Sequence, residues 1–266
     1  KLKDVDNAFW GINVIVHSSF PRAKDDIDVI VKNKVPIVIS ALGSPKELVK
    51  VVHSYGGLVF ADVVNMYFAK KAIDSGVDGL VLVSSGAGGH TGGLNPFVFV
   101  SEVRKIFDGL VILGGGITNG EQVLAAQIVG ADLAYMGTRF IATKESAAQD
   151  DYKQMILASN SSDIVISNKV TGVNANWLRP SLEKVEISFY NKILSKLMVF
   201  IFKYLPVKFR KPNFAKFDSA KEYKKWKDIY SAGQGVGSID TVLSVKELVN
   251  NIISQYKESK ESIKKK

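Results

Sequence analysis

Short apolar runs alternate with helix-like segments from the start of the chain to about residue 146, and this alternation limits the possible folds most strongly. The runs recur roughly every 20–25 residues and are rich in Val, Ile and Leu without a polar partner at every second position. Such continuous runs are typical of strands buried on both faces of a parallel sheet. The expected strands are residues 10–16, 36–40, 57–61, 79–83, 110–113 and 133–136.

Helices are expected between these strands, at residues 45–55, 69–75, 96–107 and 120–129. Ser44, with a proline after it, and Asn119 are predicted to cap two of them. Strand and helix in strict alternation predict an α/β fold with a parallel sheet. The alternation alone leaves two architectures open, a doubly wound open sheet and a closed (β/α)₈ barrel.

The composition excludes several classes of protein. The chain has 266 residues, 46% hydrophobic and 23% charged, which fits one soluble barrel-sized domain. It has no cysteine, which excludes disulfides, thiolate metal sites and cysteine nucleophiles, and fits a reducing compartment such as the cytoplasm. The formal net charge is +9, and part of it falls in residues 257–266, where we expect a solvated basic tail rather than a nucleic-acid site. No run is long and apolar enough to predict a membrane-spanning helix.

The chain divides by pattern into three parts. Residues 1–146 carry the strand–helix alternation, residues 147–256 are expected to form a helical or lid region that packs on them, and residues 257–266 the basic tail. Residues 147–185 show helix-like and turn-like stretches without strand alternation. Residues 187–205 predict an amphipathic helix with lysines on one face. That helix packs on the barrel, or on a second subunit in a homo-oligomer, or lies on a membrane.

A glycine-rich segment, SSGAGGHTGGLNP at residues 84–96, directly follows one predicted strand. Glycines remove side chains at the strand end and let backbone N–H groups approach an anion or a flat ring. The loop also contains His90. Catalytic groups of barrel enzymes gather at the C-terminal ends of the strands, which makes His90 a candidate catalytic residue. A loop histidine with only structural bonds is the alternative.

Two more glycine-containing loops follow the last two predicted strands: LGGGITN at 113–119 and YMGTRF at 135–140. Each leads into a helix, so backbone N–H groups and the helix dipole both favour an anion there. We therefore predict a phosphate cradle made of Gly115, Gly116, Gly137 and Thr138. Loops after the last two strands commonly form such a site in (β/α)₈ barrels, whereas a Rossmann fold gathers its glycines in the first turn, and this favours the barrel.

These segments together resemble one family. GAGGHTGGLNPFVFVSEVR, GGGITNG, GADLAYMGTRFIAT, VTGVNANWLRPS and SAGQGVGSIDTV, in this order, are similar to the nitronate monooxygenases, once called 2-nitropropane dioxygenases. The resemblance implies a (β/α)₈ barrel that binds FMN, with residues 1–146 as the FMN-binding barrel portion. It implies that His90 is the active-site histidine, a general base or a substrate-orienting group. It implies a cofactor site formed by Ala87, Gly88, Gly115, Gly116, Met136, Gly137 and Thr138.

The family's reaction is the oxidation of nitronates or nitroalkanes with O₂ to a carbonyl compound and nitrite. Flavin-dependent enoyl-thioester reductases share the fold and are the alternative, as is a non-catalytic, truncated flavin-binding barrel. Family barrels open with two strands before one that resembles residues 10–16. We therefore expect the chain to lack the first two β-α units of the barrel.

Other polar residues have two interpretations each, a pocket role or a structural one: His17, Asn13, Asp62, Arg139 and Gln234. His53 falls in a predicted helix and is expected to be solvated. No cluster of histidines or carboxylates predicts a metal site.

Overall fold

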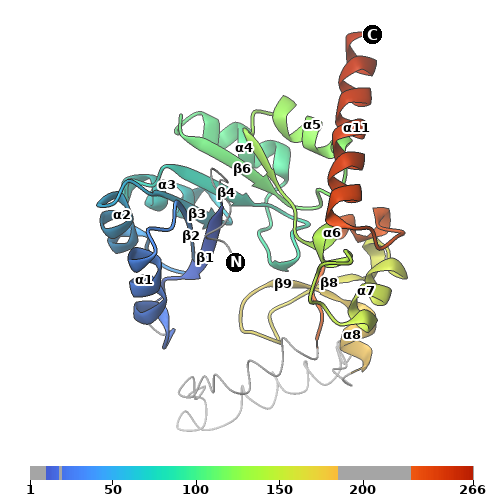
Figure 1. The fold of residues 1–266 in the computed structure, drawn as a ribbon, viewed down its shortest axis with the longest axis horizontal. Helices are drawn as coiled ribbons and strands as arrows, with labels where there is room; N and C mark the ends of the chain where they lie inside the picture. The colour runs from blue at the N-terminus through green and yellow to red at the C-terminus, as the bar shows by residue number, and fades with distance from the viewer. Residues whose placement is uncertain (1–9, 18–19, 185–228, 266) are drawn as a thin grey trace, which may run out of the picture.

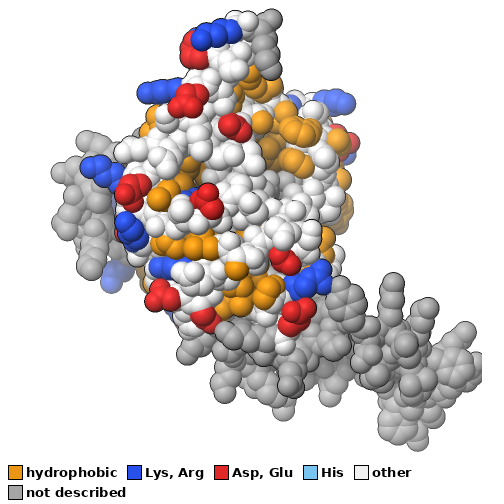
Figure 2. Space-filling model, turned by 90° about the vertical axis from the view of Figure 1, so that its right-hand side faces the viewer, with side chains coloured by type: hydrophobic (Ala, Val, Ile, Leu, Met, Phe, Trp, Pro, Cys, Tyr) orange, Lys and Arg blue, Asp and Glu red, His pale blue; other side chains and the backbone are white. Residues whose placement is uncertain are grey.

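The computed structural model describes residues 10–17, 20–184 and 229–265. The predicted helix at 187–205 lies outside these residues. No helix in the described ranges has the length and hydropathy to cross a membrane. Figure 2 shows basic and acidic side chains intermingled on the face that it draws, so positive charge is not gathered into one patch there.

Six parallel strands form the main sheet, in the order β1-β2-β3-β4-β6-β7. The sheet curls into a half-barrel, with its helices along the convex side (Figure 1). Every strand lies within two residues of a predicted run, so the parallel α/β prediction is confirmed. The strands are β1 (Gly11–Ile15), β2 (Ile37–Ala41), β3 (Leu58–Val63), β4 (Gly79–Val83), β6 (Leu110–Gly114) and β7 (Leu133–Tyr135).

The two faces of the sheet have different partners. Val38, Val59 and Leu80 point outward into the large core that the helices cover. Their neighbours Phe60 and Val81 point inward and pack with Ile112 in a cluster of strand residues alone. A doubly wound sheet has helices on both faces, whereas a barrel fills its interior with strand side chains. The packing therefore has the barrel arrangement, with six strands described.

Four helices match the predicted segments: α2 (Lys46–His53), α3 (Met66–Asp74), α4 (Pro96–Arg104) and α5 (Gly120–Ile128). Helix α1 (Ala23–Lys32) and the short α6 (Thr138–Ile141), which follows β7, were not predicted. Asn119 caps α5 as predicted, because its side chain accepts a hydrogen bond from Gln122 N. The cap predicted at Ser44 is wrong. Pro45 occupies the N-cap position of α2, and Ser44 Oγ lies 3.5 Å from Lys46 N, at the limit of a hydrogen bond.

The prediction of only helix and turn over residues 147–185 is also wrong. Besides α7 (Asp150–Leu157), η1 (Ser161–Asp163) and α8 (Arg179–Lys184), this region contains β8 (Ile164–Ser167) and β9 (Ala175–Leu178). With β5 (Gly89–His90) they form a separate antiparallel sheet in the order β5-β9-β8. All four residues of β9 are buried, so the strand has no exposed face that would produce an alternating pattern.

The C-terminal end is a helix rather than a frayed tail. After η3 (Gln234–Ser238), helix α11 (Val245–Lys264) runs through most of the predicted tail. A capping box between Ser244 and Glu247 begins it, and an ion pair between Lys264 and Glu261 stabilises its last turn. The helix packs against α5, where the Tyr256 hydroxyl group donates a hydrogen bond to Gln127.

Arg104 joins α4 to the starts of two strands. Its guanidinium group donates to Gly130 O at 2.7 Å, to Gly109 O at 2.8 Å and to Asp132 Oδ2 at 2.5 Å, and Asp132 Oδ2 also accepts from Val111 N. Burial alone raises the pKa of Asp132, but the Val111 N–H group and Arg104 outweigh it and hold the pKa below its ordinary value.

We expect Arg104→Met to lower the free energy of unfolding by about 1–3 kcal/mol, because it leaves these acceptors without their donor. The carboxylate's share of this stabilisation is present above the ordinary carboxyl pKa and is lost as the pH falls through the lower folded value. Urea unfolding at neutral and acidic pH measures both effects. Lys105→Met, one position along on the exposed surface, is the control and is expected to stay within about 0.5 kcal/mol.

Candidate functional site

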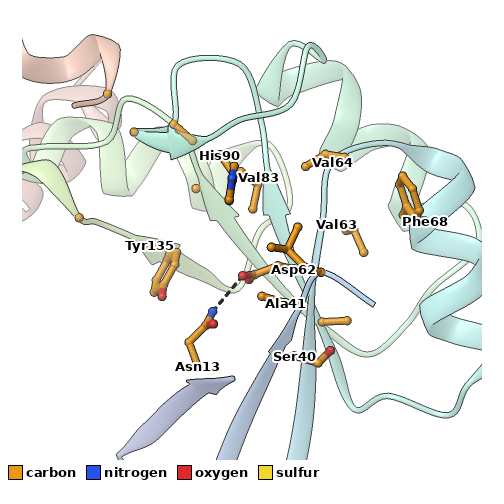
Figure 3. Close-up of a pocket in the computed structure, with 18 of the residues that line it drawn as sticks. Asn13, Ser40, Ala41, Asp62, Val63, Val64, Phe68, Val83, His90 and Tyr135 are labelled. Atoms are coloured by element: carbon orange, nitrogen blue, oxygen red, sulfur yellow. Dashed lines mark hydrogen bonds between the residues drawn. The ribbon is translucent and has the colours of Figure 1, made fainter. Parts of the chain in front are cut away.

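A cavity of about 820 Å³ opens at the C-terminal ends of the parallel strands. This volume is in the range of a cofactor site. Side chains from β1, β2, β3, β4 and β7 line it, together with the loops after β4, β6 and β7 and the segment 231–235 (Figure 3). The end of the barrel at which it opens is the end predicted to carry the chemistry.

The structure brings seven of the eight predicted site residues to this cavity. They are Ala87, Gly88, His90, Gly115, Gly116, Gly137 and Thr138. Met136 is not among the lining residues, because side chains alternate along β7: Tyr135 faces the cavity, while Ala134 and Met136 pack against the core under the helices.

The predicted phosphate cradle has free donors. Within the described residues, no protein acceptor takes the backbone N–H of Gly115, Gly116 or Gly137. Gly115 has a φ of +139°, and a Cβ there would clash with Ser84 Oγ, so the turn requires glycine. A Cβ at Gly137 would meet no atom within 4 Å, because the position faces open space. The two strand ends therefore leave room for a group that accepts hydrogen bonds.

The helix contribution to this cradle differs from the prediction. The first N–H groups of α5 bind side chains instead of facing the cavity: Gly120 N donates to Gln255 Oε1, and Gln122 N donates to Asn119 Oδ1. Helix α6 has only four residues, so its dipole is small. The loop N–H groups, rather than helix dipoles, are the donors that remain.

The segment 231–235, which falls in the region expected to form a lid, closes one side of the cavity. Gly233 N donates to Thr138 Oγ1 at 2.9 Å, and Gln234 N donates to Gly86 O at 2.9 Å. Ser231, Gly233 and Gly235 line the cavity. Gln234 itself is not a lining residue, and its N–H group holds the glycine loop, so its turn interpretation is the one observed.

His90 lies on β5, opposite Ala175 of β9, and its side chain lines the cavity half-buried. Burial lowers the pKa of His90 below its ordinary value and so favours the neutral imidazole. The buried Asn176 side chain donates from Nδ2 to Ala87 O at 2.7 Å and fixes the same loop. The antiparallel sheet therefore positions the histidine from outside the barrel.

Asn13 and Asp62 were each expected to have either a pocket role or a structural role, and the structure shows both. They line the cavity, and Asn13 Nδ2 donates to Asp62 Oδ2 at 2.9 Å. Burial raises the pKa of Asp62 to about 6, against the opposing effect of the Asn13 hydrogen bond. Burial, and then the charge of Asp62, raises the pKa of the nearby Tyr135.

Of the remaining candidate residues, one lines the cavity and two have structural contacts away from it. His17 lines the cavity. His53 ends α2 with Nε2 2.9 Å from Asp78 Oδ2, so it is hydrogen-bonded as well as partly solvated. Arg139 is buried away from the cavity and donates to Thr241 O and Ala142 O, so neither the phosphate contact nor a salt bridge is observed for it. The described residues contain no group of three side chains that fits a metal ion.

Comparison with known proteins decides the family. The family model described as nitronate monooxygenase matches residues 5–255. The chain belongs to this family. A relative from Rhodococcus jostii, named as a 5-hydroxy-7a-methyl-1-oxo-octahydro-1H-indene-4-carboxyl-CoA dehydrogenase, is 30% identical over 68% of this chain and 51% of its own length. A probable nitronate monooxygenase from Staphylococcus saprophyticus is 31% identical over 58% of this chain and 47% of its own.

Among solved structures, FabK from Thermotoga maritima superimposes with a TM-score of 0.78 at 27% identity, covering 99% of this chain and 80% of that one. The fold is thus the (β/α)₈-barrel type predicted from the sequence. The chain spans about half the length of the curated relatives that it matches.

Proposed function

We propose that this chain is the FMN-binding part of an oxidoreductase that acts on nitronates or nitroalkanes with O₂. The observation that carries the proposal is that three backbone N–H donors, at Gly115, Gly116 and Gly137, share one cavity with a half-buried histidine and have no acceptor in the part of the chain that the structure describes. Membership of the nitronate monooxygenase family supports a flavin enzyme. We further propose residues 1–146 as the cofactor-binding part and the segment 231–235 as part of a lid.

The cradle suits FMN because that cofactor ends in a phosphate monoester with several acceptor oxygens. Gly115, Gly116 and Gly137 offer N–H groups to it, and the Thr138 hydroxyl group, which accepts from Gly233 N, still has a proton to donate. The small residues Ala87 and Gly88 leave space for a flat ring beside the loop. When bound, the flavin supplies the electron-transfer chemistry.

The proposed role of His90 is to take the α-proton of a neutral nitroalkane. Its lowered pKa keeps the imidazole unprotonated at neutral pH, which a general base requires. The loop that carries it is fixed by Asn176 and by Gln234 N, so the ring is held at the cavity wall.

An absorbance spectrum of the purified chain, with mass spectrometry of any released cofactor, tests the proposal. Bound FMN is the expected result. A colourless chain that takes up no FMN on addition would contradict it, and bound FAD would contradict the choice of cofactor.

A second candidate function is the reduction of an enoyl thioester. The Rhodococcus relative is named for a carboxyl-CoA substrate, and the match to FabK spans almost the whole chain. This function requires a reduced nicotinamide cofactor. Rapid anaerobic bleaching of the bound flavin by NADH would favour it, and the absence of bleaching favours the nitronate reaction.

A further inference from the structure

Asp62 is an acidic residue in the interior of a barrel whose strand side chains are otherwise largely apolar. On β3 it points to the same side as Phe60, and Phe60 packs with Val81 and Ile112 inside the barrel. The carboxyl group is therefore the top layer of the barrel interior, at the floor of the cavity. Figure 3 shows its side chain reaching from β3 toward Asn13, with Tyr135 nearby and His90 above.

The two oxygens of the Asp62 carboxyl group are used differently. Oδ2 accepts the Asn13 hydrogen bond, whereas Oδ1 is buried and has no hydrogen-bond partner in the described structure. A buried, unsatisfied carboxylate oxygen is costly, and stable proteins rarely keep one without a reason. The Asn13 contact also fixes the rotamer, so Oδ1 is held in one direction.

Within the described residues, no lysine or arginine forms an ion pair with this carboxyl group. Burial and the Asn13 hydrogen bond are the influences on its pKa, and Lys71, which also lines the cavity, has its Nζ 4.4 Å from the centre of the Tyr67 ring. A carboxyl group that lines a cavity and is held in one orientation by a hydrogen bond is suited to a hydrogen-bond donor on a ligand. An ionised carboxylate there also repels an anion such as a nitronate.

We infer that the Asp62 carboxyl group binds a hydroxyl group of the substrate, and that the enzyme therefore prefers neutral, hydroxyl-bearing nitro compounds to plain nitroalkanes. This inference rests on the proposed function for the substrate class. A site built to bond a hydroxyl group discriminates strongly against the analogue that lacks it, because the buried acceptor then stays unpaired. Hydrogen bonds to charged groups contribute about 1.5–3 kcal/mol, which corresponds to a roughly 10- to 100-fold preference.

Two ligands of nearly equal size test the inference: 2-nitroethanol and 1-nitropropane, which differ by a hydroxyl in place of a methyl group. Their dissociation constants are measured by ligand-observed NMR at about pH 7.5, above the Asp62 pKa of about 6. The chain as purified is expected to bind 2-nitroethanol at least about 10-fold more tightly. Asp62→Leu is expected to abolish or reverse this preference, because an apolar floor favours the methyl group.

Asp108→Asn is the matched control, since it removes an exposed carboxylate that does not line the cavity, and it should keep the preference. Asp62→Asn preserves the side-chain size and covers the case in which the leucine variant does not fold; we expect it to keep less than about a third of the preference. An unchanged ratio in either folded Asp62 variant, or no preference in the wild-type chain, overturns the inference.

The measurement does not require flavin, so it separates this inference from the proposed function. If the chain binds no FMN but prefers the hydroxyl compound in a way that depends on Asp62, the binding role of Asp62 is supported and the proposed oxidase function is contradicted. Bound FMN without a preference for the hydroxyl compound would support the proposed function and overturn the binding role of Asp62.

Discussion

Replacing Gly137 by valine is expected to weaken FMN binding by a factor on the order of 100, while the chain stays folded. The Cβ position of Gly137 points into open space at the cavity, so a branched side chain fills the volume that the phosphate would occupy. Losing two charge-assisted hydrogen bonds of about 1.5 kcal/mol each accounts for a change of this size. Gly137 has a φ of −115°, outside the left-handed region that favours glycine, so the variant should still fold.

Fluorescence titration of FMN gives the dissociation constant, and thermal unfolding checks the fold. Gly93→Val is the matched control. Gly93 is exposed, its Cβ position is also open, and it lies on the glycine-rich loop without lining the cavity. FMN affinity unchanged in the Gly137 variant would exclude the phosphate cradle, whereas equal losses in both variants would indicate a general effect on the loops.

The sequence predicted the parallel strands well, because a strand buried on both faces leaves a local signal. Val38, Val59 and Leu80 face the helices, while Phe60 and Val81 face the barrel interior, so each run is apolar throughout. Strand β9 was missed although all its residues are buried. Its four residues include Asn176, whose side-chain nitrogen donates to Ala87 O, 89 positions away. No local pattern contains that partner.

In the site, too, residues with a local sequence signal were predictable, whereas contacts between distant residues were not. His90 and the glycines were predictable because each lies in one short loop directly after a strand. The Asn13–Asp62 pair joins positions 49 residues apart, and Gly233 reaches Thr138 across 95 residues. Both contacts depend on how the barrel curls and where the C-terminal segment returns. The sequence suggested each residue as a candidate or as a turn, and only the fold brought them into one cavity.

Replacing His90 by asparagine is expected to lower kcat/KM for neutral nitroalkanes by a factor on the order of 10²–10⁴, while preformed nitronates lose less than about tenfold and FMN stays bound. The two substrates differ by the α-proton that His90 is proposed to remove, so only the neutral compound needs a base. His53→Asn is the control, since His53 pairs with Asp78 and does not line the cavity. Equal losses on both substrates would exclude the base role and favour one in substrate orientation.

The pH profile adds an independent criterion for the same variant. Because burial lowers the pKa of His90, the imidazole stays neutral as the pH falls to its ordinary value of about 6.5, and the rate on neutral nitroalkanes should decline only below that. Asp62 titrates near 6 in the same cavity, so the wild-type profile contains both groups. Asp62 is unchanged in His90→Asn, and the part of the acidic decline that disappears in this variant therefore belongs to His90. A decline of the same midpoint and depth in the variant would assign the whole profile to Asp62 and leave His90 without a role in proton transfer.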